Sequence, residues 1–497
     1  MTELIYQKNI CYNVPILKNA KERRITMKVR NKWIAVLCSA AMAACMATGV
    51  AAEEATTAET ETMEETVATE PERAAQVIVQ EEHVEDTNGE PGIRKVYTVN
   101  HIYGDGQKVS HVIVEYNTAI AADSLALDTF EVKDRTITAI HTNSECEVTE
   151  ENAEGNYVVL ELEIQSPILD DKYATDGRIK GMTVIDSATV IQHQDVTAVD
   201  GTVIVGSEEE HSTSGGDGGI MGNDAVITPD MSRFDDNHYY NDPDSHTVLH
   251  YNFYKPEGYS ESGEKYPLVL FIPDASAVGD SWEYILQQGN GGTVWASEEW
   301  QAENPCFVVT MIYADKYIND YWEYYEDYMF GTMNLIRDLE EKYPIDTSRV
   351  YTTGQSMGCM ASMVMMEKDP ELFSAAFIMA GQWDPEQVKD IKDQNLLLLV
   401  SEDDPACQRL DKNVAKWEEE GGVVARATFE GIASPEEQAA VIDEALSSDA
   451  NICYLKIKTG TGSMDLDGNA LKGSHRMTWR LGYDLPGVKE WLFSQTK

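Results

Sequence analysis

The chain has 497 residues, which is too long for one compact domain and long enough for two, one of them a large enzyme. Its 86 acidic and 38 basic residues give a formal net charge of -48. Because this charge repels phosphates and anionic headgroups, it argues against binding to nucleic acid or to an anionic membrane surface.

The first predicted element is an export signal within residues 1–52. Three basic residues within 28–32 precede an uncharged, Ala-rich stretch that ends in small residues at Val50 and Ala52. A basic region, a short apolar core and small residues at the end are the parts of a secretory signal peptide. The apolar core is shorter than the roughly 20 residues of a membrane span. We therefore expect a secreted or cell-surface protein, with lipid attachment at Cys45 and a permanent anchor as open alternatives.

The number and spacing of the cysteines indicate whether disulfides or a metal site are expected. Loss of the leader leaves five of the eight cysteines, which is sparse and odd for an exported protein. No disulfide framework is predicted, although a pair such as Cys359 with Cys407 is compatible with the sequence. Since no Cys and His cluster has the spacing of metal ligands, we also expect no structural metal.

The next part of the chain divides into three predicted segments. Residues 53–94 are dense in Glu, Thr and Ala without an apolar period, which predicts an unfolded acidic spacer. Residues 95–206 contain short β-branched and aromatic runs, several of which alternate, as at Val112 and Val114. About seven such runs predict a small immunoglobulin-like β-sandwich. Residues 207–225, rich in Gly and Glu, predict a flexible linker.

Residues 226–497 form the predicted catalytic domain. Its buried-looking strands are continuous apolar runs separated by helices: Leu268–Ile272, Phe307–Ile312, Val350–Thr353, Ala375–Met379, Leu396–Val400 and Tyr454–Lys458. Helices are expected across Thr332–Lys342, after Gly358 and across Gly487–Gln495. Such alternation predicts a mostly parallel sheet flanked by helices.

A motif typical of a nucleophilic serine follows the strand Val350–Thr353. Residues 354–358 read Gly-Gln-Ser-Met-Gly and run directly into an apolar helix. This strand–turn–helix context is that of the nucleophile elbow of an α/β hydrolase, in which the serine, here Ser356, sits in a strained turn. The flanking glycines give the strand and the helix room to approach each other.

A serine hydroxyl needs a histidine to accept its proton and a carboxylate to orient that histidine. His475 is the only one of the ten histidines that lies after Ser356, and it fits the chain order of serine, acid and histidine. The acid is expected in the loop after Leu396–Val400. We predict Asp404, with Asp403 as the main rival.

Two backbone N–H groups must stabilise the developing oxyanion. The first belongs to Met357, directly after the nucleophile. The second is expected in the loop after Leu268–Ile272, where Pro273 has no N–H and Ala275 is the candidate.

Four residues are predicted to line the substrate pocket because they lie beside the nucleophile or in loops expected near it: Gln355, Trp322, Gln382 and Trp383. Many aromatic residues between 313 and 330 suit a sugar or a phenolic ring. They are equally compatible with packing onto the core.

Four segments together resemble a known group of enzymes: residues 354–358, 401–404 (Ser-Glu-Asp-Asp), 475–479 (His-Arg-Met-Thr-Trp) and 490–495 (Glu-Trp-Leu-Phe-Ser-Gln). The chain resembles secreted bacterial esterases labelled predicted peptidases, relatives of polyhydroxybutyrate depolymerases and feruloyl esterases. Some of these carry an N-terminal immunoglobulin-like domain. The resemblance covers residues 95–497 and implies cofactor-free acyl transfer to water through an acyl-serine, with Asp404 as the acid. Many relatives have His-Gly where this chain has Pro273 and Asp274, which leaves the second oxyanion donor open.

The sequence therefore predicts a secreted serine esterase that hydrolyses small or carbohydrate-linked esters through Ser356, His475 and Asp404, without metal or cofactor. A serine peptidase is an alternative, because amide and ester cleavage share the acyl-enzyme. A third alternative is an inactive surface binding protein on a hydrolase scaffold. The altered loop at Pro273 favours that reading, whereas the intact serine, acid and histidine argue against it.

Overall fold

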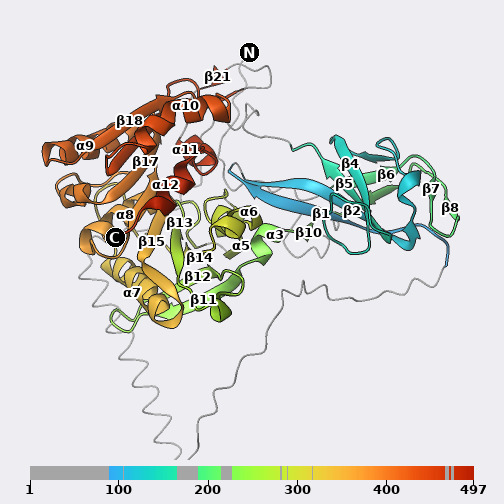
Figure 1. The fold of residues 1–497 in the computed structure, drawn as a ribbon, viewed down its shortest axis with the longest axis horizontal. Helices are drawn as coiled ribbons and strands as arrows, with labels where there is room; N and C mark the ends of the chain where they lie inside the picture. The colour runs from blue at the N-terminus through green and yellow to red at the C-terminus, as the bar shows by residue number, and fades with distance from the viewer. Residues whose placement is uncertain are drawn as a thin grey trace, which may run out of the picture. The chain divides into compact units, whose positions relative to one another are not determined.

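Figure 1 shows the protein as a computed structural model. The structure describes residues 89–497 apart from 105, 165–187, 214–225, 280–281, 288, 316, 465–469 and 472–474. The predicted signal peptide (1–52) and most of the predicted spacer lie outside the described residues. Within the described part of the chain, no helix has both the length and the apolar character of a membrane span.

The N-terminal domain consists of two main β-sheets. The larger sheet has the order β10-β1-β2-β5-β4 and is formed by β1 (Ile93–Tyr103), β2 (Gly106–Ile120), β4 (Ile137–Asn143), β5 (Gly155–Leu162) and β10 (Val226–Ile227). The smaller sheet has the order β3-β6-β9, formed by β3 (Phe130–Val132), β6 (Thr189–Gln192) and β9 (Glu210–Ser212). A short 3-10 helix, η1 (Ala122–Ser124), and the pair β7 (Val196–Thr197) and β8 (Val203–Ile204) complete the domain. Val114 of β2 and Val190 of β6 belong to one buried cluster, as expected of a sandwich.

The predicted linker is shorter in the structure than the composition indicates. Strand β9 lies inside the range 207–225 and pairs with β6, with Thr189 opposite Ser212. An ion pair between Lys133 and Glu210 adds a contact across the same sheet. A polar, charged segment can thus complete a sheet edge, because an edge strand needs only its backbone groups to pair.

The C-terminal domain is built on a nine-stranded sheet with the order β11-β12-β14-β13-β15-β16-β17-β19-β18. Its strands are β11 (Asp235–Asn241), β12 (Val248–Tyr254), β13 (Tyr266–Ile272), β14 (Phe307–Ile312), β15 (Ile345–Gln355), β16 (Ala375–Met379), β17 (Asn395–Ser401), β18 (Val424–Phe429) and β19 (Ile452–Ile457). Strand β12 pairs antiparallel with β11 and β14, and the other neighbours pair in parallel.

Helices cover both faces of this sheet (Figure 1). The core cluster on one face includes side chains from α7 (Glu326–Lys342), α8 (Met357–Lys368) and α9 (Pro405–Glu419). The cluster on the other face includes side chains from α5 (Trp282–Gln287), α6 (Glu298–Glu303), α10 (Pro435–Leu446), α11 (His475–Gly482) and α12 (Val488–Ser494). The remaining short elements are α3 (Pro229–Ser232), α4 (Tyr259–Ser262), η3 (Val294–Ala296), η4 (Lys389–Asp393), β20 (Ser463–Met464) and β21 (Ala470–Leu471). The predicted α/β-hydrolase sheet is confirmed.

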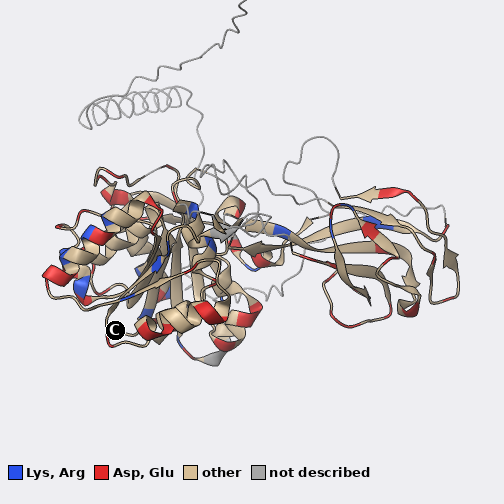
Figure 2. Cartoon of the chain, turned by 90° about the horizontal axis from the view of Figure 1, so that it is seen from above, with Lys and Arg blue, Asp and Glu red and all other residues tan. Residues whose placement is uncertain are grey.

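Among the described residues, most acidic residues lie on solvated helices, strands and loops (Figure 2), and only Asp242, Asp274 and Asp404 are buried. All five cysteines among the described residues are free, so the pair Cys359 and Cys407 does not form a disulfide.

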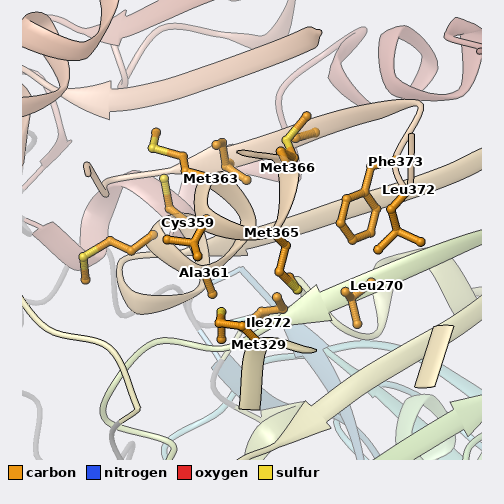
Figure 3. Close-up of a cluster of buried hydrophobic side chains, with 14 of the residues drawn as sticks. Leu270, Ile272, Met329, Cys359, Ala361, Met363, Met365, Met366, Leu372 and Phe373 are labelled. Atoms are coloured by element: carbon orange, nitrogen blue, oxygen red, sulfur yellow. The ribbon is translucent and has the colours of Figure 1, made fainter. Parts of the chain in front are cut away.

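Helix α8, directly after the motif at 354–358, is buried along most of its length. Residues 357–366 are all buried, and Figure 3 shows methionine, cysteine and alanine side chains spreading from the helix beside Leu270 and Ile272 of β13. Because unbranched methionine side chains adapt to irregular gaps, a Met-rich helix can fill the space between the sheet and its neighbours. The apolar run in the sequence is explained by this burial.

Two glycines allow β13 to approach this helix closely. A Cβ atom placed on Gly354 would lie 2.4 Å from the carbonyl oxygen of Ile272, and one placed on Gly358 would lie 2.0 Å from the same atom. Both distances are far below van der Waals contact, so β13, β15 and α8 can meet only where these side chains are absent.

We expect Gly358→Ala to lower the free energy of unfolding by about 1–3 kcal/mol, because the added methyl group forces backbone atoms apart. Chemical denaturation monitored by tryptophan fluorescence measures this change. Gly92→Ala is the matched control, since no atom lies within 4 Å of its added Cβ. Equal stability of the two variants would contradict this account of the close packing.

Candidate active site

Ser356 lies in a strained turn between β15 and α8. Its φ of 52° and ψ of -111° fall outside the regions that non-glycine residues normally adopt. The Ser356 N–H donates to the carbonyl of Met379 (2.9 Å), and its own carbonyl accepts from the N–H of Met360 (3.1 Å). The neighbouring strand β16 and the first turn of the helix thus hold the serine in this conformation.

His475 lies between Ser356 and Asp404. Its Nε2 atom is 2.9 Å from Ser356 Oγ, and its Nδ1 atom is 2.7 Å from Asp404 Oδ2. The geometry suits the tautomer in which Nδ1–H donates to the carboxylate and Nε2 accepts the serine hydroxyl proton. The imidazole also meets the ring of Trp479 edge-on at 5.1 Å, which fixes its plane from the side.

The carboxylate of Asp404 is held by a second set of contacts. Its side chain is only 2% exposed, against 40% for His475. Asp404 is the N-cap of α9, and its Oδ1 atom accepts the N–H of Ala406 at 2.8 Å. The helix N-terminus favours the negative charge. The two carboxylate oxygens therefore have separate partners, one in the helix and one in the imidazole.

The two neighbouring carboxylates, Asp403 and Glu402, accept hydrogen bonds from other residues. Asp403 Oδ2 accepts the N–H of Gly460 (2.8 Å), and Glu402 Oε2 accepts the N–H of Thr459 (2.9 Å). Of the neighbouring carboxylates, the structure therefore brings Asp404 to His475. On the histidine side, Thr478 Oγ1 accepts the N–H of Ser401 at 3.2 Å and ties α11 to the end of β17.

The two predicted oxyanion donors belong to the first residue of α8 and to the loop after β13. Met357 is the first residue of α8, where a backbone N–H has no partner within its own helix. Ala275 follows β13, is partly buried and packs against the core cluster that contains Met357. Neither N–H donates in the hydrogen bonds found among the described residues. Their role as oxyanion donors remains a prediction.

The predicted pocket residues are mostly occupied by contacts within the fold. Gln355, Gln382 and Trp383 are 1%, 3% and 1% exposed, respectively. Gln382 donates to Asp320 Oδ1 (2.8 Å), and the ring of Trp383 packs at 5.5 Å from that of Trp322. Trp322 alone of the four keeps partial exposure. A contact with substrate remains a prediction for these residues.

Other reactive groups near the serine are less suited to chemistry. Cys359 lies one turn further along α8, and burial raises the pKa of its thiol far above the usual value. It therefore stays protonated and is a poor nucleophile at neutral pH. Among the described residues, no group of three or more Cys, His, Asp or Glu side chains has a geometry that could hold a metal ion.

The fold and the arrangement of these side chains define an α/β hydrolase, and comparisons with known families agree. Residues 246–428 match the family model described as "Putative esterase", and residues 95–205 match the esterase immunoglobulin-like N-terminal domain. The predicted resemblance is confirmed. The chain is a serine hydrolase that acts on carboxylic esters.

Among solved structures, the crystal structure of a thermostable esterase has 23% sequence identity and a TM-score of 0.61, and the match covers 81% of this chain and 100% of that one. The feruloyl esterase module from Clostridium thermocellum complexed with sinapinate shares 12% identity over 52% of this chain and 86% of that one, with a TM-score of 0.36. An S-formylglutathione hydrolase from Agrobacterium tumefaciens shares 13% identity over 52% and 95% of the two chains, with a TM-score of 0.32. A comparison with curated proteins found no match.

The different partners of Asp404 and Asp403 lead to a test of the acid. We expect Asp404→Asn to lower kcat by about 10⁴-fold, because an amide in this position favours the wrong imidazole tautomer. Asp403→Asn should leave kcat within about threefold of the parent, since its carboxylate contacts Gly460 rather than His475. Steady-state hydrolysis of a chromogenic ester measures both. The reverse order of effects would assign the acid to Asp403.

Proposed function

We propose that the protein is a secreted esterase that uses Ser356 as nucleophile, His475 as general base and Asp404 as the orienting acid. The observation that carries the proposal is the continuous hydrogen-bond chain from Ser356 Oγ through the imidazole to the buried carboxylate. A serine hydroxyl becomes nucleophilic when a base accepts its proton as it attacks.

In the proposed mechanism, Oγ of Ser356 attacks the ester carbonyl carbon while Nε2 of His475 takes the hydroxyl proton. The oxyanion accepts hydrogen bonds from the N–H groups of Met357 and Ala275. The carbonyl re-forms, the alcohol leaves with the proton from His475, and an acyl-serine remains. A water molecule, deprotonated by the same imidazole, then releases the acid and restores the serine.

The substrate class is proposed as small or carbohydrate-linked carboxylic esters. Two aromatic residues support this class: Trp322 keeps partial exposure, and Tyr321 beside it is 83% exposed. Aromatic faces of this kind can pack against a sugar or a phenolic ring. The motif and the fold are shared by amidases and esterases, so a peptidase is the outcome that the substrate test must separate.

We expect Ser356→Ala to lower kcat for a chromogenic ester by about 10⁶-fold, as expected when the nucleophile of such a unit is removed. The parent, but not the variant, should also be labelled covalently by a fluorophosphonate. Circular dichroism controls for folding. An unchanged rate in the folded variant would contradict the serine mechanism. Hydrolysis of peptide amides by the parent that is lost in Ser356→Ala would replace the esterase by a peptidase.

The predicted signal peptide should direct the protein out of the cytoplasm and be cleaved off. Expressed in a bacterial host, the full chain should appear outside the cytoplasm with a new N-terminus near Glu53, because small residues precede that position. A chain that starts at Glu53 is the matched control and should stay in the cytoplasm. Cell fractionation and N-terminal sequencing give the answer, and full-length protein found only in the cytoplasm would contradict secretion.

A further inference from the structure

The loop between Ile272 and Gly279 contains a buried carboxylate, Asp274, that belongs to neither the serine nor the histidine. Asp274 is only 7% exposed. Its Oδ1 atom accepts the N–H of Ser276 at 2.7 Å, and its backbone carbonyl accepts the N–H of Ala277 at 3.2 Å. A buried carboxylate is costly unless hydrogen bonds satisfy it, so these contacts define the conformation of the turn.

This turn starts directly beside the nucleophile elbow. The carbonyl oxygen of Ile272, two residues before Asp274, is the atom that approaches Gly354 and Gly358 most closely. At its other end, the loop is fixed by the N–H of Gly279, which donates to the carbonyl of Tyr313 at 2.7 Å. The turn is therefore anchored on both sides, with the elbow at one end.

The contacts of Asp274 use two of the N–H groups that follow it in the turn and leave a third, that of Ala275, without such a bond. Ser276 and Ala277 both donate to Asp274, whereas the N–H of Ala275, which precedes them, makes none of the hydrogen bonds found among the described residues. The Ala275 methyl group packs against the core cluster of the elbow. The Ala275 N–H belongs to the same peptide as the Asp274 carbonyl, so rotation of this peptide would break the bond from Ala277. The side-chain bond from Ser276 to Asp274 Oδ1 restricts the backbone angles on both sides of this peptide, so the direction of the Ala275 N–H depends on the aspartate.

We propose that Asp274 is a positioning residue that holds the Ala275 N–H in place as the second oxyanion donor. The inference rests on the proposed function. The aspartate acts through its acceptor oxygen and not through its charge, since a negative charge beside the oxyanion opposes the transition state. An amide oxygen in the same position should therefore serve as well.

The experiment compares Asp274→Ala with Asp274→Asn in the full chain. Asp274→Ala should lower kcat by about 10- to 100-fold, part of the loss known for removal of a whole oxyanion donor, with KM changed less than about threefold. Asp274→Asn should restore kcat to the parent value or above it. Inhibition by a trifluoromethyl ketone, which forms a tetrahedral adduct with the serine, should weaken in Asp274→Ala by the same factor as kcat and recover in Asp274→Asn.

Asp200→Ala is the matched control, because Asp200 accepts the N–H of Thr202 in a similar turn within the N-terminal domain (2.9 Å) and should leave kcat unchanged. Parent kcat for Asp274→Ala, or an asparagine variant as slow as the alanine variant, would overturn the proposal. If Asp274→Ala does not fold, Asp274→Leu replaces it, because leucine fills a similar volume but offers no acceptor oxygen; parent kcat and parent inhibition in that variant would likewise overturn the proposal. Ser356→Ala runs in the same assay, so activity that survives there contradicts the proposed function rather than the role of Asp274.

Discussion

The close approach of the Ile272 carbonyl oxygen to Gly354 and Gly358 is the constraint on which the rest of the site depends. Because three backbones meet there, the chain must turn sharply from β15 into α8, and Ser356 takes a φ of 52°. The same packing buries the first turns of α8 completely, which explains why that helix consists of small and flexible apolar residues. It also places the end of β13, and so the start of the loop that follows, beside the elbow.

The partners of Ser356 are fixed by contacts that link the acid loop to the chain on both sides of the histidine. Thr459 and Gly460 donate to the two carboxylates that precede Asp404, and Thr478 accepts from the backbone of Ser401. Residues far apart in the sequence therefore hold one another before any substrate arrives. Preorganisation of this kind is what allows hydrogen-bond donors and acceptors to act without rearrangement during the reaction.

Much of the sheet could be predicted from the sequence, because strands buried on both faces give continuous apolar runs. The bounds of β14 and β16 agree with the predicted Phe307–Ile312 and Ala375–Met379. Strands β11, β12 and β18 were not predicted. Strand β18 alternates polar and apolar residues, and β11 begins with two aspartates, so neither gives a continuous apolar run. Tertiary pairing, rather than local pattern, makes them strands.

Some residues of the site could also be predicted from the sequence, and others could not. The order of Ser356 and His475 along the chain was enough to pair them, as His475 has no rival after the serine. The acid was harder, because Asp403 and Asp404 are adjacent and follow the same strand. One local signal separates them: Pro405 suits the first position of a helix, which makes Asp404 the cap. The burial of Trp383 and Gln382 depends on distant residues such as Asp320 and was beyond reach of the sequence.

The cap at Asp404 has a consequence for how this enzyme can change over time. Catalytic residues are often held at the expense of the fold, so that replacing one makes a protein more stable and less active. Here the carboxylate that orients His475 also begins α9, and losing a cap acceptor costs about 1 kcal/mol. Replacing Asp404 with a residue that cannot cap the helix is therefore expected to lower both the stability and the activity. A descendant that had lost hydrolysis would still be selected to keep Asp, Asn, Ser or Thr there, so an intact acid is weaker evidence of activity than an intact serine or histidine.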